Sequence, residues 1–367
     1  MRLSWISKIF FFLNILVGTA LVITNFSSKF EPVSNPYGYL FSLTYPIFLV
    51  LNIGFVLHWM YQKKIHFLFS LILILFGYSN VSKLVAFNWK DNIATTADFK
   101  IMTFNVRLLN QYHSLNEENI DNQIFEYIES ENPDIIAFQE FVDSKVLDLN
   151  YVKRMKSLGY KYTQREPNQR KKSKLNFFGL QTFSKFKIKK SGLAYRFADK
   201  SKARSYYTDI EIQSQIVRVY NTHLNSLGFI SEDYQFVENI TQNSETEAIE
   251  KSKNILNKVI RAARKRQTEV EEIAKHIAAC PYPVIVLGDF NEPPYSFAYP
   301  RFATDLEDPF QKFGFGVGTT FDGISTLPGL RLDYILHSPE LKAISYKTGQ
   351  KNLSDHRPVC SQFMLPQ

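Results

Sequence analysis

The sequence predicts an α/β chain in which apolar helices precede a sheet-rich sandwich flanked by helices. The first 90 residues contain three apolar runs that carry few charges, and charged residues are concentrated after them. From residue 100 onward, strand-like and helix-like patterns alternate to the end of the chain. The roughly 270 residues of this second part have the size of one large α/β domain.

Each apolar run has the length of a helix that crosses a membrane. The first extends over Ile6–Phe26 and carries only Lys8, and the second extends over Tyr39–Tyr61 without any Asp, Glu, Lys or Arg. The third extends over Ile65–Phe87 and carries only Lys83. About 20 apolar residues cross a hydrocarbon core of roughly 30 Å, so we expect three transmembrane helices. A cleaved signal peptide is the alternative for the first run, but no small-residue cleavage site is evident.

The charges that flank these runs predict an orientation. Arg2 and Lys8 lie at the start of the first run, and Lys63 and Lys64 lie between the second and the third. Positively charged loops stay in the cytoplasm, so the chain after the third run is expected outside it. In a bacterium this would be a multi-pass inner-membrane protein, with a membrane domain at 1–90, a linker at 91–99 and a periplasmic catalytic domain at 100–367.

Composition limits the partners and the cysteine chemistry. A net charge of +8 and a pI near 9.1 favour acidic partners such as nucleic acid, phospholipid head groups or phosphorylated small molecules. Two cysteines, Cys280 and Cys360, are too few for a disulfide framework or a thiolate metal site. They are interpreted as two buried thiols, with one disulfide between them as the alternative.

Hydrophobic periodicity predicts the elements of the second part. KIMTFNV predicts a strand over Lys100–Val106, helical spacing predicts a helix over Asn119–Glu131, and an apolar strand follows Pro133. Further strands are predicted at 178–183, 206–212, 216–221, 284–287, 331–336 and 359–364. The segment EAIEKSKNILNKVIRAARKRQTEVEEIAKHIAA predicts a long helix, on which basic residues up to Arg266 precede Glu269 and further acids. Such spacing predicts a self-paired solvent face.

Polar residues close several of these strands, where a rigid scaffold commonly positions catalytic groups. Asn105 closes KIMTFNV, and Glu140 follows the apolar strand of PDIIAFQE. An oxygen ligand at that point suits a hard cation such as Mg²⁺. In VRVYNTHLNS, His223 and Asn225 have strand spacing and should project to the same side.

Similar residues recur in the last third of the chain. VIVLGDFNEPPYS has Asp289 and Asn291 directly after an apolar strand, RLDYIL contains Asp333, and SDHRP contains Asp355 and His356. Taken singly, a Glu, Asn or His at such a position is more often a cap, turn or structural residue, and Asp333 could equally begin a turn or pair with Arg331. Together they supply metal ligands, general acid–base groups and a carboxylate that can orient a histidine, which predicts a metal-dependent phosphoester site.

The order and the residues of these motifs resemble those of the endonuclease/exonuclease/phosphatase superfamily. The resemblance covers nearly all of Lys100–Leu365, and GDFN followed by SDH is a specific pair of motifs. It implies a four-layer sandwich of two packed, mainly antiparallel β-sheets flanked by helices. It also implies catalysis with Mg²⁺, or with Mn²⁺ or Ca²⁺, without an organic cofactor. The residues implied at the metal are Asn105, Asp355 and, as the principal ligand, Glu140.

The same resemblance implies the catalytic roles. His223 and His356 would flank the scissile phosphate, and Asp289 would activate or orient the attacking water. Asn291 would hold water or a phosphate oxygen, and Asp333 would orient His356. Close to this set, the side chain of Asn225 is expected to contact the substrate.

The predicted function is hydrolysis of a phosphodiester or phosphomonoester by a membrane-tethered enzyme that faces the periplasm. The substrate would be a lipid, a nucleotide or another small molecule. An extracytoplasmic nuclease is the first alternative, because phosphate contacts dominate nucleic-acid affinity. The second is a non-catalytic membrane protein that binds a phosphorylated ligand, although the presence of Glu140, Asp289 and His356 argues against it.

Overall fold

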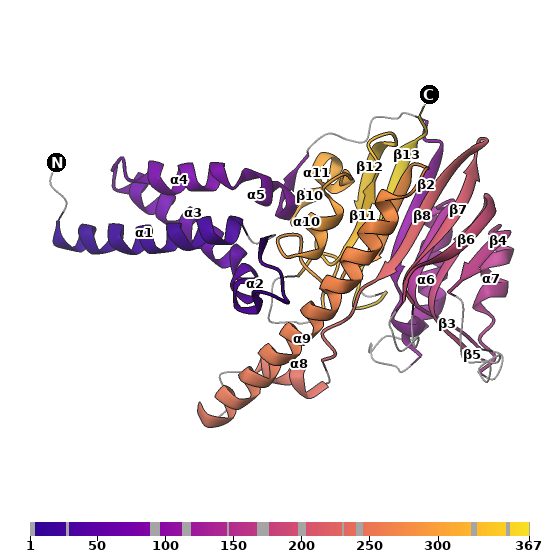
Figure 1. Cartoon of the computed structure of the whole chain (residues 1–367), viewed down its shortest axis with the longest axis horizontal. Coiled ribbons are helices and arrows are strands. Elements are labelled where there is room, and N and C mark those ends of the chain that lie inside the picture. Colours follow the sequence, from indigo (N-terminus) through magenta and orange to yellow (C-terminus); the bar gives the residue numbers. More distant parts are fainter. Residues whose placement is uncertain are drawn as a thin grey trace.

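The structure is a computed structural model that describes residues 4–26, 29–88, 96–111, 119–144, 147–166, 176–196, 203–229, 231–239, 245–323, 329–349 and 353–366. Residues 91–95 of the expected linker lie outside these ranges. The first part is a bundle of apolar helices, and the second is a layered sandwich beside it (Figure 1).

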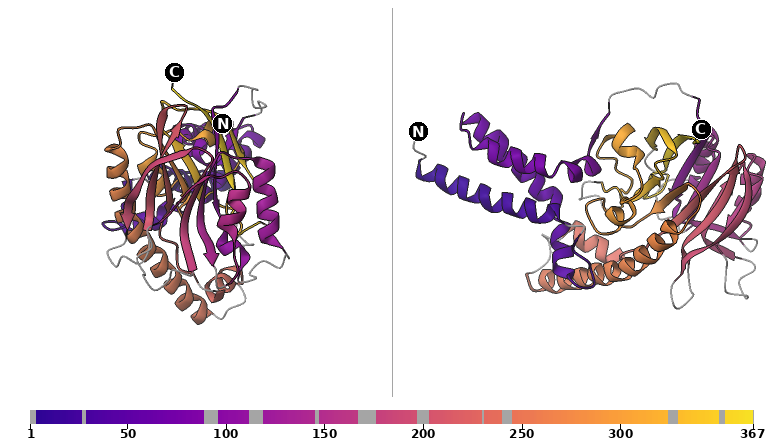
Figure 2. Two further views of the ribbon diagram at one scale, coloured as in Figure 1. Left: turned by 90° about the vertical axis from the view of Figure 1, so that its right-hand side faces the viewer. Right: turned by 45° about the horizontal axis from the view of Figure 1, so that its top comes forward.

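The bundle contains α1 (Trp5–Asn25), α3 (Tyr45–Tyr61) and α4 (Phe67–Phe76), with α2 (Pro36–Ser42) and α5 (Tyr78–Leu84) at the end nearest the sandwich (Figures 1 and 2). Asn14 joins the three longer helices. Its amide donates to Ser70 Oγ at 2.6 Å, and its side-chain oxygen accepts the Trp59 indole N–H at 3.0 Å. Polar groups of an apolar bundle need such partners, so these bonds favour one packing arrangement.

The expectation of three continuous transmembrane helices needs correction. In the described part of the chain, α1 is the one helix long and apolar enough to cross a membrane, and the count rises to three if each bent pair is one span. The run Tyr39–Tyr61 bends by 46° between α2 and α3, and the run Ile65–Phe87 bends by 72° between α4 and α5. The second bend lies at Gly77, where a Cβ would be 2.5 Å from Asn25 Oδ1. Hydropathy reports apolar length and is insensitive to such bends.

The described strands of the sandwich form two large sheets. The six-stranded sheet has the order β12 (Lys342–Thr348), β13 (Val359–Met364), β2 (Phe99–Asn105), β3 (Ile135–Ser144), β5 (Asn176–Ser184), β4 (Tyr162–Arg165). The five-stranded sheet has the order β11 (Asp333–His337), β9 (Val284–Asp289), β8 (Gln215–His223), β7 (Ala203–Ile212), β6 (Lys187–Arg196). A short pair, β1 (Ala86–Phe87) with β10 (Phe315–Gly316), joins the first part to the second.

Both large sheets are mixed, because each contains a parallel pair among its antiparallel neighbours. β2 runs parallel to β3 and is connected to it through α6 (Ile120–Glu131), and β8 runs parallel to β9 and is connected through α8 (Ser231–Glu238) and α9 (Glu245–Ala278). Parallel strands end at the same edge of a sheet. β2 and β3 therefore end together in one sheet, and β8 and β9 end together in the other. The hydrogen bond from Asn105, at the end of β2, to Asp289, at the end of β9, shows that these two edges face each other.

Helices cover the outer face of each sheet, which gives the four layers that the resemblance implies (Figures 1 and 2). Along β2, Ile101 faces the core between the sheets, whereas Met102 and Phe104 pack with α6. This alternation is the two-residue period of a strand that is buried on both faces. The outer face of the five-stranded sheet packs against α9 and α10 (Ala298–Phe302), and α7 (Tyr151–Ser157) packs with α6 on the six-stranded sheet. Phe310 of α11 (Pro309–Phe313) instead joins the core between the sheets.

One further expectation from the sequence is wrong. On α9, Arg266 and Glu269 are almost completely buried rather than part of a solvent face, because their partners lie in other elements. The interpretation of Cys280 and Cys360 as free thiols is confirmed, although Cys280 is only partly buried, and they do not form the alternative disulfide.

Candidate active site

The predicted residues at the ends of β2, β8 and β9 lie together. The Asn105 amide donates to Asp289 Oδ2 at 3.1 Å. His223 is the register partner of Asp289, and its Nε2 lies 3.6 Å from Asp289 Oδ2 and 3.9 Å from Glu140 Oε1. The two sheets thus contribute to one polar cluster at a shared edge of the sandwich.

The GDFN motif folds tightly around Asp289. Asn291 has a left-handed φ of 52°, a conformation that asparagine tolerates. Its backbone N–H donates to Asp289 Oδ1 at 2.8 Å, and its side-chain amide donates to Asp289 Oδ2 and to Leu224 O, both at 3.1 Å. Gly288 has a φ of +132°, and a Cβ there would lie 1.8 Å from Thr222 O. Glycine is therefore required where β9 approaches β8 just before both site residues.

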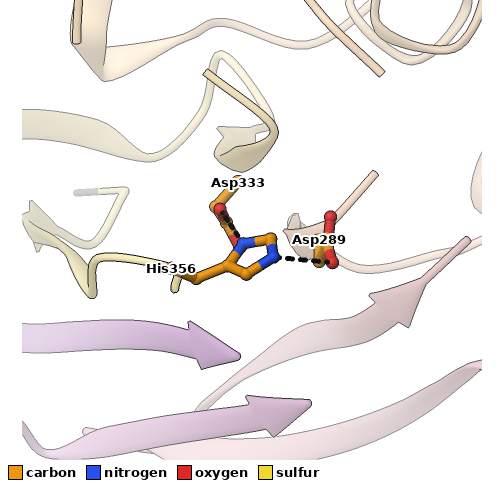
Figure 3. A group of neighbouring side chains, drawn as sticks. All are labelled: Asp289, Asp333 and His356. Atoms are coloured by element: carbon orange, nitrogen blue, oxygen red, sulfur yellow. Dashed lines mark hydrogen bonds and ion pairs between the residues drawn. The ribbon is translucent and has the colours of Figure 1, made fainter. Parts of the chain in front are cut away.

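His356 lies between two aspartates (Figure 3). Its Nδ1 is 2.8 Å from Asp333 Oδ2, and its Nε2 is 3.7 Å from Asp289 Oδ2. The Asp333 backbone N–H donates to Thr320 Oγ1 at 3.0 Å, which fixes the start of β11. The ring of Phe321 contacts the imidazole, with 4.9 Å between the ring centroids.

This arrangement shifts the pKa values of both His356 and Asp289. Burial alone would lower the pKa of His356, but the nearby Asp333 and Asp289 outweigh it and raise that pKa. Burial raises the pKa of Asp289, against the opposing effect of His356. The imidazole is therefore stabilised in its protonated form, which donates to Asp333 through Nδ1 and presents Nε2 to Asp289.

Glu140 does not follow its strand as the sequence predicted, because β3 continues to Ser144. It lies at a bulge between Phe138 and Phe141, with a φ of 52°. Bulges of this kind redirect a side chain, and strained non-glycine residues concentrate at functional sites. The Glu140 side chain is 30% exposed, compared with 1% for Asp289, so a cation from solvent can reach its carboxylate.

Arg107, which the sequence analysis missed, connects two of the predicted metal ligands. Its backbone N–H donates to Asn105 Oδ1 at 3.1 Å, and its guanidinium lies 2.9 Å from Asp355 Oδ2. Its position two residues after Asn105 could have indicated that Arg107 belongs to the site. The atoms with which Asn105, Glu140 and Asp355 would bind a metal are all oxygens, which fits a hard cation such as Mg²⁺.

A second group could hold a metal by distance alone. Ligand atoms of Asp289, Asp333 and His356 lie within 4.8 Å of one another. Here the imidazole already donates to Asp333, and the raised pKa of His356 opposes the neutral form that a metal requires. The contacts of this group therefore favour a protonated imidazole.

Asn225 lies beyond the end of β8, so the strand spacing that predicted a shared face with His223 does not apply. Its side-chain oxygen accepts from Arg204 Nη2 at 3.2 Å. Its backbone N–H donates to Glu269 Oε2 at 2.8 Å, and its carbonyl accepts from Arg266 Nη1 at 2.7 Å. The residue is held firmly by α9, next to the polar cluster.

Two family models match the chain. The model described as the Endonuclease/Exonuclease/phosphatase family matches residues 102–356, and a domain of unknown function (DUF8431) matches residues 7–84. No curated protein gives a significant match.

Solved structures of low sequence identity share the fold. An endonuclease/exonuclease/phosphatase from Beutenbergia cavernae has 16% identity and a TM-score of 0.51, with 74% of this chain and 72% of that chain covered. One from Bacteroides vulgatus has 19% identity and a TM-score of 0.51, with 74% and 100% covered. A mannosyl-6-phosphatase from Bacteroides thetaiotaomicron has 17% identity and a TM-score of 0.50, with 73% and 100% covered.

Proposed function

Because this chain belongs to the endonuclease/exonuclease/phosphatase family, we propose that it hydrolyses a phosphoester with the help of a divalent cation. The observation that carries the proposal is the position of Asp289 between His223 and His356, with Asn105 and Asn291 bonded to its carboxylate. A buried carboxylate can accept a proton from water, and protonated imidazoles on either side of it can hold an anionic phosphoryl group.

Each side chain then has a distinct role in hydrolysis. Asp289 orients the attacking water and takes its proton, while His223 and His356 flank the phosphoryl group and stabilise its charge. Asn291 holds water or a phosphoryl oxygen beside Asp289. Asp333 holds the Nδ1–H of His356, so that Nε2 faces the reacting group, as an orienting carboxylate does in hydrolytic triads.

Glu140, Asn105 and Asp355 would hold the metal ion. A bound divalent cation would neutralise charge that builds on the phosphoryl oxygens. Arg107 keeps Asn105 and Asp355 close to each other and adds a positive charge at the same edge of the site. Asn225 would help to bind the substrate through the polar surface that it forms with Arg204.

We infer that the N-terminal part anchors this enzyme in a membrane through α1 and the bent pairs α2–α3 and α4–α5. Many large apolar side chains of these helices are exposed, which suits lipid rather than water. The start of α1 and the connection between α3 and α4 lie at the end of the bundle away from the sandwich (Figure 1). These two segments carry Lys8, Lys63 and Lys64, which supports a catalytic part outside the cytoplasm. In a bacterium this would be the periplasm, and the accessibility of single engineered cysteines to a membrane-impermeant reagent would test it.

Membrane attachment favours a substrate at or near the bilayer, because it raises the local concentration of enzyme there. A lipid phosphoester is therefore our first candidate substrate. The phosphatase from Bacteroides thetaiotaomicron, a structural neighbour, is a reason to test a sugar phosphate, and the basic composition of the chain is a reason to test DNA.

The test uses the full chain in detergent with Mg²⁺. Its substrates are bis(p-nitrophenyl) phosphate, p-nitrophenyl phosphate, mannose 6-phosphate, sphingomyelin and plasmid DNA. Hydrolysis of one class should disappear with a chelator and in Glu140→Ala and His356→Ala, but persist in the control Glu340→Ala, which changes an exposed carboxylate. A folded wild-type chain that leaves all five substrates intact would argue for the ligand-binding alternative.

A further inference from the structure

A tyrosine of the N-terminal part is buried inside the second part of the chain. Tyr39, on α2, is 1% exposed and belongs to the apolar cluster that α9 and α10 form on the five-stranded sheet. Its hydroxyl donates to Glu292 Oε1 at 2.9 Å and accepts from Arg266 Nη2 at 3.2 Å. Figures 1 and 2 both draw α2 beside α9.

Tyr39 completes the bonding of a buried ion pair. Arg266 Nε lies 2.7 Å from Glu292 Oε1, and both side chains are 1% exposed. The other carboxylate oxygen of Glu292 accepts from Ser296 Oγ at 2.6 Å and from the Ala298 N–H at 2.9 Å. A buried ion pair is stable only when its remaining hydrogen-bonding groups are satisfied. The Tyr39 hydroxyl satisfies one such group on each partner.

This ion pair holds two loops of the candidate site. Glu292 directly follows Asn291, which donates two hydrogen bonds to Asp289. Arg266 also donates to the carbonyl of Asn225, two residues after His223. One buried guanidinium thereby links the loop after β9 to the loop after β8.

The N-terminal part contacts the neighbouring segments of the site in the same way. The ring of Tyr45 packs on that of Tyr295, with 5.6 Å between the centroids, in the loop that begins with the GDFN motif. The carbonyl of Lys83 accepts from Arg331 Nη2 at 3.0 Å, two residues before Asp333. The segments that carry Asp289 and Asp333 are thus both bonded to, or packed on, the helical part.

We propose that Tyr39 is a positioning residue for the phosphoesterase site, and that the helical part completes the scaffold of this site instead of only tethering it. The proposal rests on the proposed function. Phenylalanine at position 39 would keep the ring in the apolar cluster but remove one hydrogen bond from Glu292 and one from Arg266. The loops of Asn291 and Asn225 would then be held less firmly, with no change at the catalytic groups themselves.

The experiment compares Tyr39→Phe with Tyr37→Phe in the full chain in detergent. Tyr37 lies on the same helix and is 79% exposed, so it controls for the loss of a phenol. With bis(p-nitrophenyl) phosphate and Mg²⁺, well below the unfolding temperature, Tyr39→Phe should lower kcat about 10-fold, as supporting residues around metal sites do, and leave KM within about twofold. Tyr37→Phe should match the wild type.

Hydrogen exchange followed by mass spectrometry provides a readout that needs no turnover. Peptides over residues 286–298 and 222–229 should exchange faster in Tyr39→Phe, while a peptide over α6 stays unchanged. Equal kcat values for the two variants would overturn the proposal. If the wild-type chain hydrolyses none of the substrates, the proposed function is wrong, and hydrogen exchange alone then tests the positioning role of Tyr39. Identical exchange in the two variants, or equal acceleration in α6, then overturns the positioning role.

Discussion

Replacing Gly288 by alanine tests the close approach of β8 and β9 that brings His223 to Asp289. The nearest atoms to a Cβ at position 288 all belong to the Thr222 backbone: O at 1.8 Å, C at 2.8 Å and N at 3.0 Å. No side-chain rotation can relieve such contacts. The variant must therefore move two hydrogen-bonded strands apart, next to the register pair His223 and Asp289.

The magnitude follows from two effects. A non-glycine residue forced into a φ of +132° costs about 1–3 kcal/mol in backbone strain. Overpacking of a buried position adds about 1–3 kcal/mol. The free energy of unfolding should therefore fall by about 2–6 kcal/mol, a large fraction of the roughly 5–15 kcal/mol that typically holds a domain together.

Thermal unfolding of the purified chain measures this loss of stability, and Gly159→Ala is the matched control. Gly159 also has a positive φ, +92°, but no atom lies within 4 Å of its Cβ position, so only strain is added there. At roughly 2 °C per kcal/mol for a chain of this size, Gly288→Ala should lower the midpoint by about 4–12 °C and Gly159→Ala by about 2–6 °C. Equal shifts for the two variants would refute the argument from the strand contact.

Three further predictions concern single side chains. Asp333→Asn should lower kcat on the order of 10³-fold or more with little loss of stability, because the amide no longer fixes and stabilises the protonated imidazole; an unchanged kcat would exclude the orienting role. Glu140→Gln should weaken Mg²⁺ binding at least 10-fold by calorimetry, and equal affinity would place the metal elsewhere. Burial, although Arg204 opposes it, raises the pKa of Glu269 from 4.5 to about 7. Ionising it in the fold is therefore unfavourable, and up to about 3 kcal/mol of stability should be lost as pH rises from about 4.5 to 7. Denaturant unfolding of Glu269→Gln should show a smaller loss than the wild type over that window, and identical pH profiles would contradict this.

Local sequence patterns predicted most of the sandwich because apolar alternation and strand burial are local properties. The strand expected at 359–364 is confirmed as β13, and the long helix is confirmed as α9. β6 was missed because KIKKSGLAYR contains four basic residues. It lies at the edge of its sheet, where charged side chains are common and hydrophobic periodicity is weak.

The site was predictable where motif residues close strands and unpredictable where distant segments meet. His223 and Asp289 come together because the parallel strands β8 and β9 end at one edge, which the strand pattern suggests, whereas Asn105 reaches Asp289 from the other sheet. Arg266 was assigned to solvent from the acids that follow it on the helix, whereas its partners are Glu292 and the carbonyl of Asn225, 26 and 41 residues away. Spacing along one helix contains no information about such contacts.

The docking of α2 on α9 has a geometric consequence if α1 anchors the chain in a membrane, as proposed above. A catalytic part joined to its anchor by a flexible linker would adopt many orientations above the bilayer and meet substrates at many heights. Here the phenol of Tyr39, the carbonyl of Lys83 and the pairing of β1 with β10 fix the sandwich against the bundle at separate points. The site would then work at one height and one tilt above the lipid surface, and a cleavable bond would be selected by its distance from the membrane as well as by its chemistry.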